Sequence, residues 1–185
     1  NGEKVIINNP DEAMKMGIAM VHQELQPVLP RSVAENMYLG RFPTHNYGPL
    51  KVIDHKKMYE DTQALLDDLG LDFKATDKLG TLSTSQMQLV EIAKAVSAKA
   101  KIIILDEPTA VLTPQEIDRL FGVLRAMRED GKSVIIITHK LNETKAVADR
   151  VTVLRAGQSI CTVETEGREA SDPGFPRRLR YDLPA

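Results

Sequence analysis

The sequence predicts an α/β fold in which a parallel β-sheet is combined with a helical subdomain. Three short aliphatic runs, 18–21, 102–105 and 134–137, have the length and composition of buried strands. Amphipathic helical patterns lie between these runs, and each run is followed by polar residues. Strands that alternate with helices are typical of a parallel sheet whose ligand site lies at the carboxyl ends of its strands.

Length and composition restrict the possible partners. The chain has 185 residues, which is enough to bury a core, and a formal net charge of −2, which argues against a nucleic-acid partner. Cys161 is the only cysteine, so no internal disulfide can form and a reducing compartment is indicated. No apolar run approaches the ~18 residues of a membrane span. We therefore expect any membrane contact to be made through a partner protein.

The first part of the chain contains residues that cap helices and residues that form turns. Asn9 and Pro10 provide a cap and a first turn for a brief helix that Gly17 ends. Pro43, Gly48 and other turn-forming residues favour a surface loop further on. The expected elements are a strand over 5–7, a helix over 10–16, a strand over 18–21, a helix over 32–40 and a loop over 41–50.

The remaining elements alternate between helices and strands. Asp54 caps a helix that Gly70 stops, and Thr113 and Glu116 match a capping box. Beyond Thr165 the periodicity vanishes, so we expect a weakly packed tail. The expected elements are helices over 55–69, 114–130 and 142–148, a helix that Ser83–Gln86 opens and that carries Leu89–Val96, strands over 102–105 and 134–137, and a hairpin of 151–154 with 160–163.

The most informative segment is the apolar run that ends abruptly at Asp106 and Glu107. Four consecutive aliphatic residues suit a strand buried on both faces, and the two carboxylates then lie at its carboxyl end. In phosphate chemistry the first carboxylate can hold Mg²⁺, and the second can orient or deprotonate an attacking water. The alternative is a structural strand whose acids cap the following turn.

Two other predicted strands also end in polar side chains. Gln23 follows the strand over 18–21, and its amide oxygen can coordinate Mg²⁺ or water. His139 follows the strand over 134–137 and can donate a hydrogen bond to a γ-phosphate. Each residue alone has a simpler interpretation, as an exposed loop glutamine or a structural histidine. Together with the acidic pair they predict one ligand edge.

A polar segment, Ser83–Gln86, opens the helix that carries Leu89–Val96. Backbone N–H groups and hydroxyls at a helix N-terminus can bind an anion, and this segment is rich in both. The alternative is an ordinary serine N-cap. The candidate residues are Ser83, Thr84, Ser85 and Gln86.

The order of these motifs resembles the nucleotide-binding domain of ATP-binding cassette (ABC) transporters. Over about residues 1–163, the family's glutamine loop, signature peptide, Walker B motif and switch histidine correspond to Gln23, Leu82–Gln86, Asp106 with Glu107, and His139. The resemblance implies a P-loop NTPase-like core, and it divides the chain into a partial ATPase core (1–26), a helical subdomain with the signature (27–98), a second part of the core (99–165) and an irregular tail (166–185).

The resemblance also implies roles and cofactors. ATP and Mg²⁺ would be the cofactors, with Asp106 and Gln23 serving the metal and Glu107 acting as general base. His139 would sense the γ-phosphate. The segment from Ser83 to Gln86 would bind the nucleotide held by a second ATPase domain.

Neighbouring residues resemble the sugar-importer branch of this family, in particular its galactose-type ATPases. These stretches are Val21–Leu25, Arg31–Arg41, Met87–Ala95 and Val153–Gln158. The resemblance implies permease subunits as partners, a sugar-binding protein as an indirect partner, and a peripheral position on the cytoplasmic face of the membrane. Two alternatives remain open, an ABC-type ATPase in DNA repair and a non-catalytic interaction fragment.

The sequence departs from the family in two places. Thr84 and Ser85 stand where the usual signature has two glycines, which would let backbone approach phosphate more closely. No G-x-x-x-x-G-K-[ST] phosphate loop occurs, since the one Gly-Lys-Ser, at 131–133, has Ala126 in place of the first glycine. We therefore expect an N-terminally truncated fragment that is inactive as an ATPase on its own.

Overall fold

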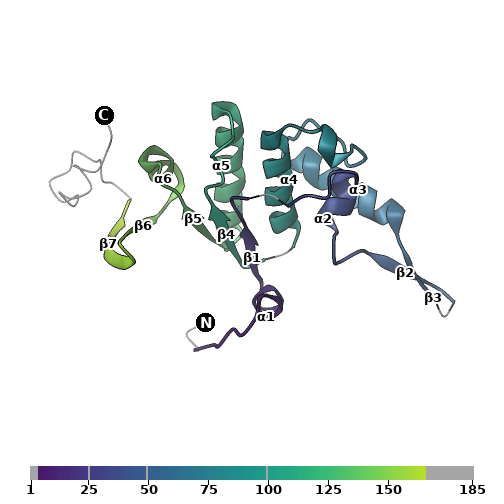
Figure 1. Cartoon of the computed structure of the whole chain (residues 1–185), viewed down its shortest axis with the longest axis horizontal. Helices are drawn as coiled ribbons and strands as arrows, with labels where there is room; N and C mark the ends of the chain where they lie inside the picture. Colours follow the sequence, from purple (N-terminus) through teal and green to yellow (C-terminus); the bar gives the residue numbers. More distant parts are fainter. Residues whose placement is uncertain (1–3, 25, 49, 99, 166–185) are drawn as a thin grey trace. The chain divides into compact units, whose positions relative to one another are not determined.

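The computed structural model describes residues 4–24, 26–48, 50–98 and 100–165 (Figure 1). The chain forms two compact units, residues 1–139 and residues 140–185. The elements of the first unit are α1 (Pro10–Lys15), β1 (Ile18–Val21), α2 (Val33–Met37), β2 (Thr44–Tyr47), β3 (Leu50–Ile53), α3 (His55–Asp68), a 3₁₀ turn (Leu79–Thr81), α4 (Thr84–Ser97), β4 (Ile102–Asp106), α5 (Pro114–Glu129) and β5 (Ser133–Ile137).

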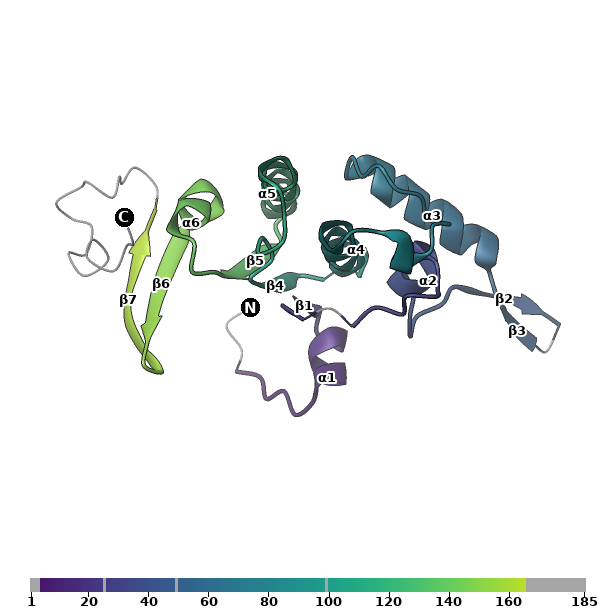
Figure 2. The ribbon, with the colours of Figure 1, turned by 45° about the horizontal axis from the view of Figure 1, so that its top comes forward.

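A three-stranded parallel sheet organises the first unit. Its strand order is β1-β4-β5, and Val21, Leu105 and Ile136 lie side by side across it. Figure 2 shows α4 and α5 on one face of this sheet and α1 on the other. Leu105 and Ile103 are buried beneath the two long helices. The predicted parallel sheet is therefore confirmed.

The sheet is buried less evenly than its sequence predicts. The side chains of Met20, Ile135 and Ile137 are 44%, 49% and 49% exposed, and Ile104 between them is half-buried. The expectation that the strand over 102–105 is buried on both faces is therefore wrong for the described residues. Successive side chains of a strand point to opposite faces of the sheet, and α4 and α5 cover only the face of Ile103 and Leu105.

The helical part has a hydrophobic core of its own. Side chains from α2, α3, α4 and the segment before the 3₁₀ turn meet there, and the amphipathic periods of α3 and α4 supply most of them. None of the helices in the described ranges is long and apolar enough to cross a membrane. The fully buried members are Val33, Ala34, Met37, Met58, Leu66, Leu79, Val90 and Ala93.

Two further expectations for the first unit are wrong. Residues 5–7 form no strand, because their side chains are exposed and no described strand pairs with them. The expected loop over 41–50 overlaps an antiparallel hairpin, in which Tyr47 pairs with Leu50 and Thr44 with Ile53. Its prolines indicated a loop, whereas the backbone hydrogen bonds of the two flanking segments are satisfied by each other.

The second unit is described over 140–165 and contains α6 (Leu141–Val147), β6 (Arg150–Arg155) and β7 (Gln158–Glu164). The two strands form the predicted antiparallel hairpin. Its turn places Ala156 and Gly157 at φ values of 49° and 74°, the left-handed conformation of a tight hairpin turn. The tail predicted over 166–185 lies outside the described residues.

Candidate functional site

The candidate site is built where β4 ends. Asp106 is the last residue of β4, opposite Ile137 of β5, and Glu107 follows in a left-handed conformation with φ of 44°. The backbone N–H of Glu107 donates to the Ile137 carbonyl at 2.9 Å, so β5 holds this turn. A left-handed conformation costs a residue with a side chain on the order of 1 kcal/mol. Such strain is typical of functional turns.

Two of the sequence-predicted residues, His139 and Gln23, meet at the carboxylate of a third, Glu107. His139 places Nδ1 3.1 Å from Oε1 of Glu107, and Gln23 donates from Nε2 to Oε2 at 3.5 Å. The first contact is a normal hydrogen bond, whereas the second is at the outer limit of one. Glu107 is 29% exposed and His139 72% exposed, so their electrostatic attraction is screened by water. The structure therefore brings Gln23, Glu107 and His139 together at one edge of the sheet.

The predicted metal residues suit Mg²⁺ only in part. Asp106 ends β4 and Gln23 follows the neighbouring strand β1, and they supply a carboxylate oxygen and an amide oxygen, the donors that Mg²⁺ prefers. No group of three His, Cys, Asp or Glu side chains gathers as a metal site among the described residues. Mg²⁺ usually takes one or two protein carboxylates, with waters and phosphates completing its shell. The residues present therefore fit a magnesium–nucleotide complex rather than a free ion.

The N-terminus of α4 is closed by a capping box. Ser83 Oγ accepts from the Gln86 backbone N–H at 3.2 Å, and Gln86 Oε1 accepts from the Ser83 backbone N–H at 2.9 Å. The predicted cap is thus present, and an anion would approach the N–H groups of Thr84 and Ser85. Both residues lie in the first helical turn, where right-handed backbone tolerates a side chain. The loss of the family's glycines therefore creates no backbone strain here.

A second capping box lies next to the first. Thr113 and Glu116 open α5, and the Glu116 carboxylate accepts from the Thr113 backbone N–H at 2.8 Å. This backbone hydrogen bond is the main reason why the pKa of Glu116 lies below its ordinary value, and the Ser85 hydroxyl contributes in the same direction. Ser85 and Glu116 therefore link the start of α4 to the start of α5.

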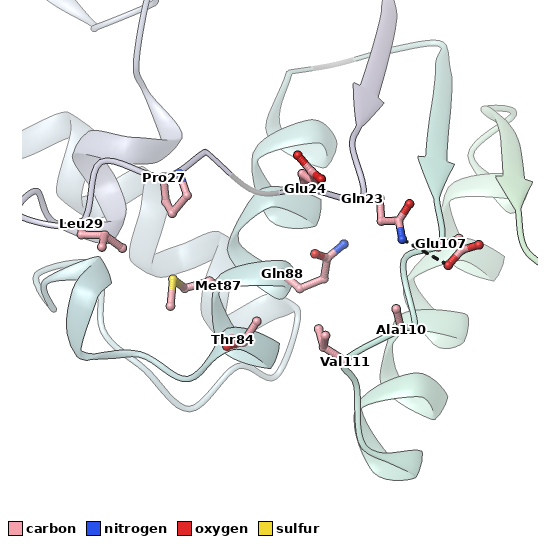
Figure 3. Close-up of a pocket in the computed structure, with 10 residues that line it drawn as sticks. All are labelled: Gln23, Glu24, Pro27, Leu29, Thr84, Met87, Gln88, Glu107, Ala110 and Val111. Carbon is pink, nitrogen blue, oxygen red and sulfur yellow. Dashed lines mark hydrogen bonds between the residues drawn. The ribbon is translucent and has the colours of Figure 1, made fainter.

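A cavity of about 510 Å³ joins these features (Figure 3). It runs from Gln23 and Glu107 at one end to Thr84 at the other, so it connects the predicted catalytic and signature residues. Sequence reasoning missed Gln88, which is buried in its wall. The available signal was a glutamine four residues before Ile92, on the buried side of α4. The remaining lining residues are Glu24, Pro27, Leu29, Met87, Ala110 and Val111.

This chain has a parallel sheet with Gln23, Glu107 and His139 at its strand ends and a helical insertion between strands. That arrangement defines its class as the ATP-binding cassettes. A nucleotide-free ATP-binding cassette from an ABC transporter superposes with a TM-score of 0.70 at 28% identity, over 85% of this chain and 64% of that one. The ADP conformation of the cassette MJ1267 gives 0.69 at 28% identity, over the same shares. A dimeric cassette, MJ0796, gives 0.71 at 21% identity over 88% and 69%, which shows the fold alone.

The family follows from a direct match. The ABC transporter family model covers residues 2–110, more than half of the chain, and this chain belongs to that family. Galactose/methyl galactoside import ATP-binding proteins are similar over 166 residues, or 90% of this chain. The identity is 46% for Sodalis glossinidius, 47% for Salmonella typhimurium and 46% for Escherichia coli K12. The chain spans 32% of the length of these relatives.

Proposed function

We propose that this chain supplies the hydrolytic edge and the signature helix of the ATPase subunit of a carbohydrate ABC importer. The observation that carries this proposal is the meeting of Gln23 and His139 at the carboxylate of Glu107. These residues come from three neighbouring strand ends of one parallel sheet. Such a meeting supports the proposal, because a base, a metal ligand and a hydrogen-bond donor are the groups that hydrolysis of a phosphate requires.

Each side chain has a separable task in this proposal. Glu107 orients and deprotonates the attacking water, and its strained backbone fixes the direction of the carboxylate. Asp106 and Gln23 provide oxygen ligands for Mg²⁺, which neutralises phosphate charge when it is bound. His139 donates a hydrogen bond to the γ-phosphate.

The signature segment serves a second nucleotide in this proposal. Ser83, Thr84, Ser85 and Gln86 at the start of α4 face the ATP held by a second ATPase domain. The free N–H groups of the first helical turn and the hydroxyls there suit a phosphate. Closure of the two domains would complete each site and move attached permease subunits.

The transported substrate is proposed from the relatives, since no residue of this site contacts it. All three relatives are named for import of galactose and methyl galactoside. We propose uptake of a galactose-like monosaccharide. The permease is the direct partner and a sugar-binding protein the indirect one, and the subunit lies peripherally on the cytoplasmic face of the membrane.

Hydrolysis tests the proposal in a hybrid subunit, in which this chain replaces the segment of the E. coli relative that it matches. We expect the hybrid to hydrolyse ATP in a Mg²⁺-dependent manner. The chain alone should show no more than background hydrolysis, since it has no phosphate-loop motif. A hybrid without ATPase activity that is folded and binds ATP would contradict the proposal.

A further inference from the structure

Gln88 is a buried polar side chain whose amide nitrogen has no partner among the described residues. Its side chain is on α4 and the residue is only 3% exposed. Within the described part of the chain, its Nε2 has no hydrogen-bond partner. A buried donor without an acceptor destabilises the folded state, so native proteins rarely keep one without a functional reason.

The amide of Gln88 is directed into the cavity. Figure 3 shows its side chain reaching from α4 toward the end of the cavity where Gln23 and Glu107 lie. The helix fixes the origin of this side chain, because its neighbours Leu89 and Ile92 are buried in the packed face of α4. The cavity is therefore the side from which an acceptor can reach Gln88.

Three side chains with oxygen atoms line the cavity near that end, Gln23, Glu24 and Glu107. Gln23 and Glu107 contact each other, and these two differ in freedom. Glu107 is held by its backbone bond to Ile137 and by its 3.1 Å contact with His139. Gln23 is exposed, lies on the segment that leaves β1, and contacts Glu107 at 3.5 Å. A contact of that length is lost at little cost. Gln23 is the group that can move.

We propose that Gln88 is a positioning residue for Gln23, whose side-chain carbonyl oxygen it binds through Nε2 when Gln23 swings into the cavity. The inference rests on the proposed function, because it gives the Gln23 amide two alternative positions. In one position Gln23 lies beside Glu107, where its oxygen can serve Mg²⁺. In the other position the oxygen is held by Gln88 on the signature helix. The orientation of α4 is thereby coupled to the position of Gln23, the proposed metal ligand.

The first test uses the chain as it is. Gln88→Met removes the unpartnered donor at nearly constant volume, so we expect the melting temperature to rise by about 2–4 °C. Gln63→Met is the matched control. The Gln63 amide is fully used, since its Nε2 donates to Asp67 at 2.8 Å and its Oε1 accepts from the Ala75 N–H at 2.9 Å. This control should lower the melting temperature by a similar amount.

The second test is a double-mutant cycle on ATP hydrolysis by the hybrid subunit. Gln88→Met should lower kcat about fivefold to tenfold, the value of one hydrogen bond, while KM for ATP stays unchanged. In the Gln23→Ala background the same substitution should change kcat less than twofold, because the partner is absent. Gln63→Met should leave kcat unchanged in both backgrounds.

Either test can overturn the inference. A loss of melting temperature with Gln88→Met equal to that of Gln63→Met would show that the amide is already satisfied. An equal loss of kcat in both backgrounds would show that Gln88 does not act through Gln23. A hybrid that fails to hydrolyse ATP before any substitution would contradict the proposed function instead, and the melting experiment would still decide the role of Gln88.

Discussion

His139 and Glu107 form a contact across two neighbouring strand ends, with Nδ1 of the imidazole 3.1 Å from Oε1 of the carboxylate. The contact joins residues 32 apart in the chain. When Nδ1 donates its hydrogen to Glu107, Nε2 is a donor only in the protonated imidazole. The contact therefore leaves Nε2 as the ring nitrogen of His139 that faces other partners.

The first prediction concerns the proposed base. In the hybrid subunit, Glu107→Gln should lower ATP turnover by about 10²- to 10⁴-fold, because an amide cannot accept the proton from water. ATP binding should be retained, since the substitution keeps the size of the side chain. Glu129→Gln, at the end of α5, controls for the loss of one charge. Equal turnover in the Glu107→Gln variant and its parent would assign the base elsewhere.

The second prediction separates structure from function at the signature helix. Ser83→Ala should reduce the free energy of unfolding by about 1 kcal/mol, because the Gln86 backbone N–H loses its cap. Thr113→Ala should cost a similar amount at the matching capping box of α5. Only Ser83→Ala should also weaken ATP-dependent dimerisation of the hybrid, measured by light scattering. Equal weakening by both variants would show that the effect is one of stability alone.

The third prediction is a pH dependence. The Thr113 backbone N–H lowers the pKa of Glu116 in the folded chain. The ionised carboxylate therefore contributes stability that is present above the unfolded pKa of about 4.3 and is lost as pH falls through the lower folded value. Glu116→Gln should flatten the fall in melting temperature between about pH 5 and 3. A fall as steep as that of the parent would contradict this assignment. Glu129→Gln again controls for charge.

The fourth prediction compares two glycines. Gly122 lies within α5, where an added Cβ would meet open space, whereas Gly157 has φ of 74° in the hairpin turn. Gly122→Ala should raise the free energy of unfolding by about 0.5–1 kcal/mol through helix propensity. Gly157→Ala should lower it by about 1 kcal/mol, because a side chain disfavours that conformation. Denaturant unfolding measures both values, and a stabilising Gly157→Ala would contradict the turn geometry.

Local patterns account for most of the elements that the sequence predicts correctly. The aliphatic run before Asp106 has the signal of a buried strand, and Thr113 with Glu116 has the signal of a capping box. These features depend on residues close together in the chain. The segment over 5–7 has the same apolar composition but no pairing partner among the described strands, and the hairpin after Pro43 depends on pairing that its prolines obscured.

The part of the candidate site that lies at the ends of the strands was predictable from the sequence. Gln23, Glu107 and His139 follow successive neighbours in one sheet, so topology alone brings them together. Gln88 was not predictable in the same way. The sequence places a glutamine beside the apolar stripe of α4, but only the packed structure shows that its amide is buried and unpartnered. Whether a buried amide finds a hydrogen-bond partner depends on tertiary packing, which the sequence pattern does not show.

The proposed function of this chain is to serve in a carbohydrate importer. Its most direct test is uptake of labelled methyl galactoside by cells that lack their own importer ATPase and express the hybrid subunit. We expect uptake to be restored by the parent hybrid and lost again with Glu107→Gln. Restoration of peptide or metal uptake, with every monosaccharide unaffected, would contradict the sugar assignment.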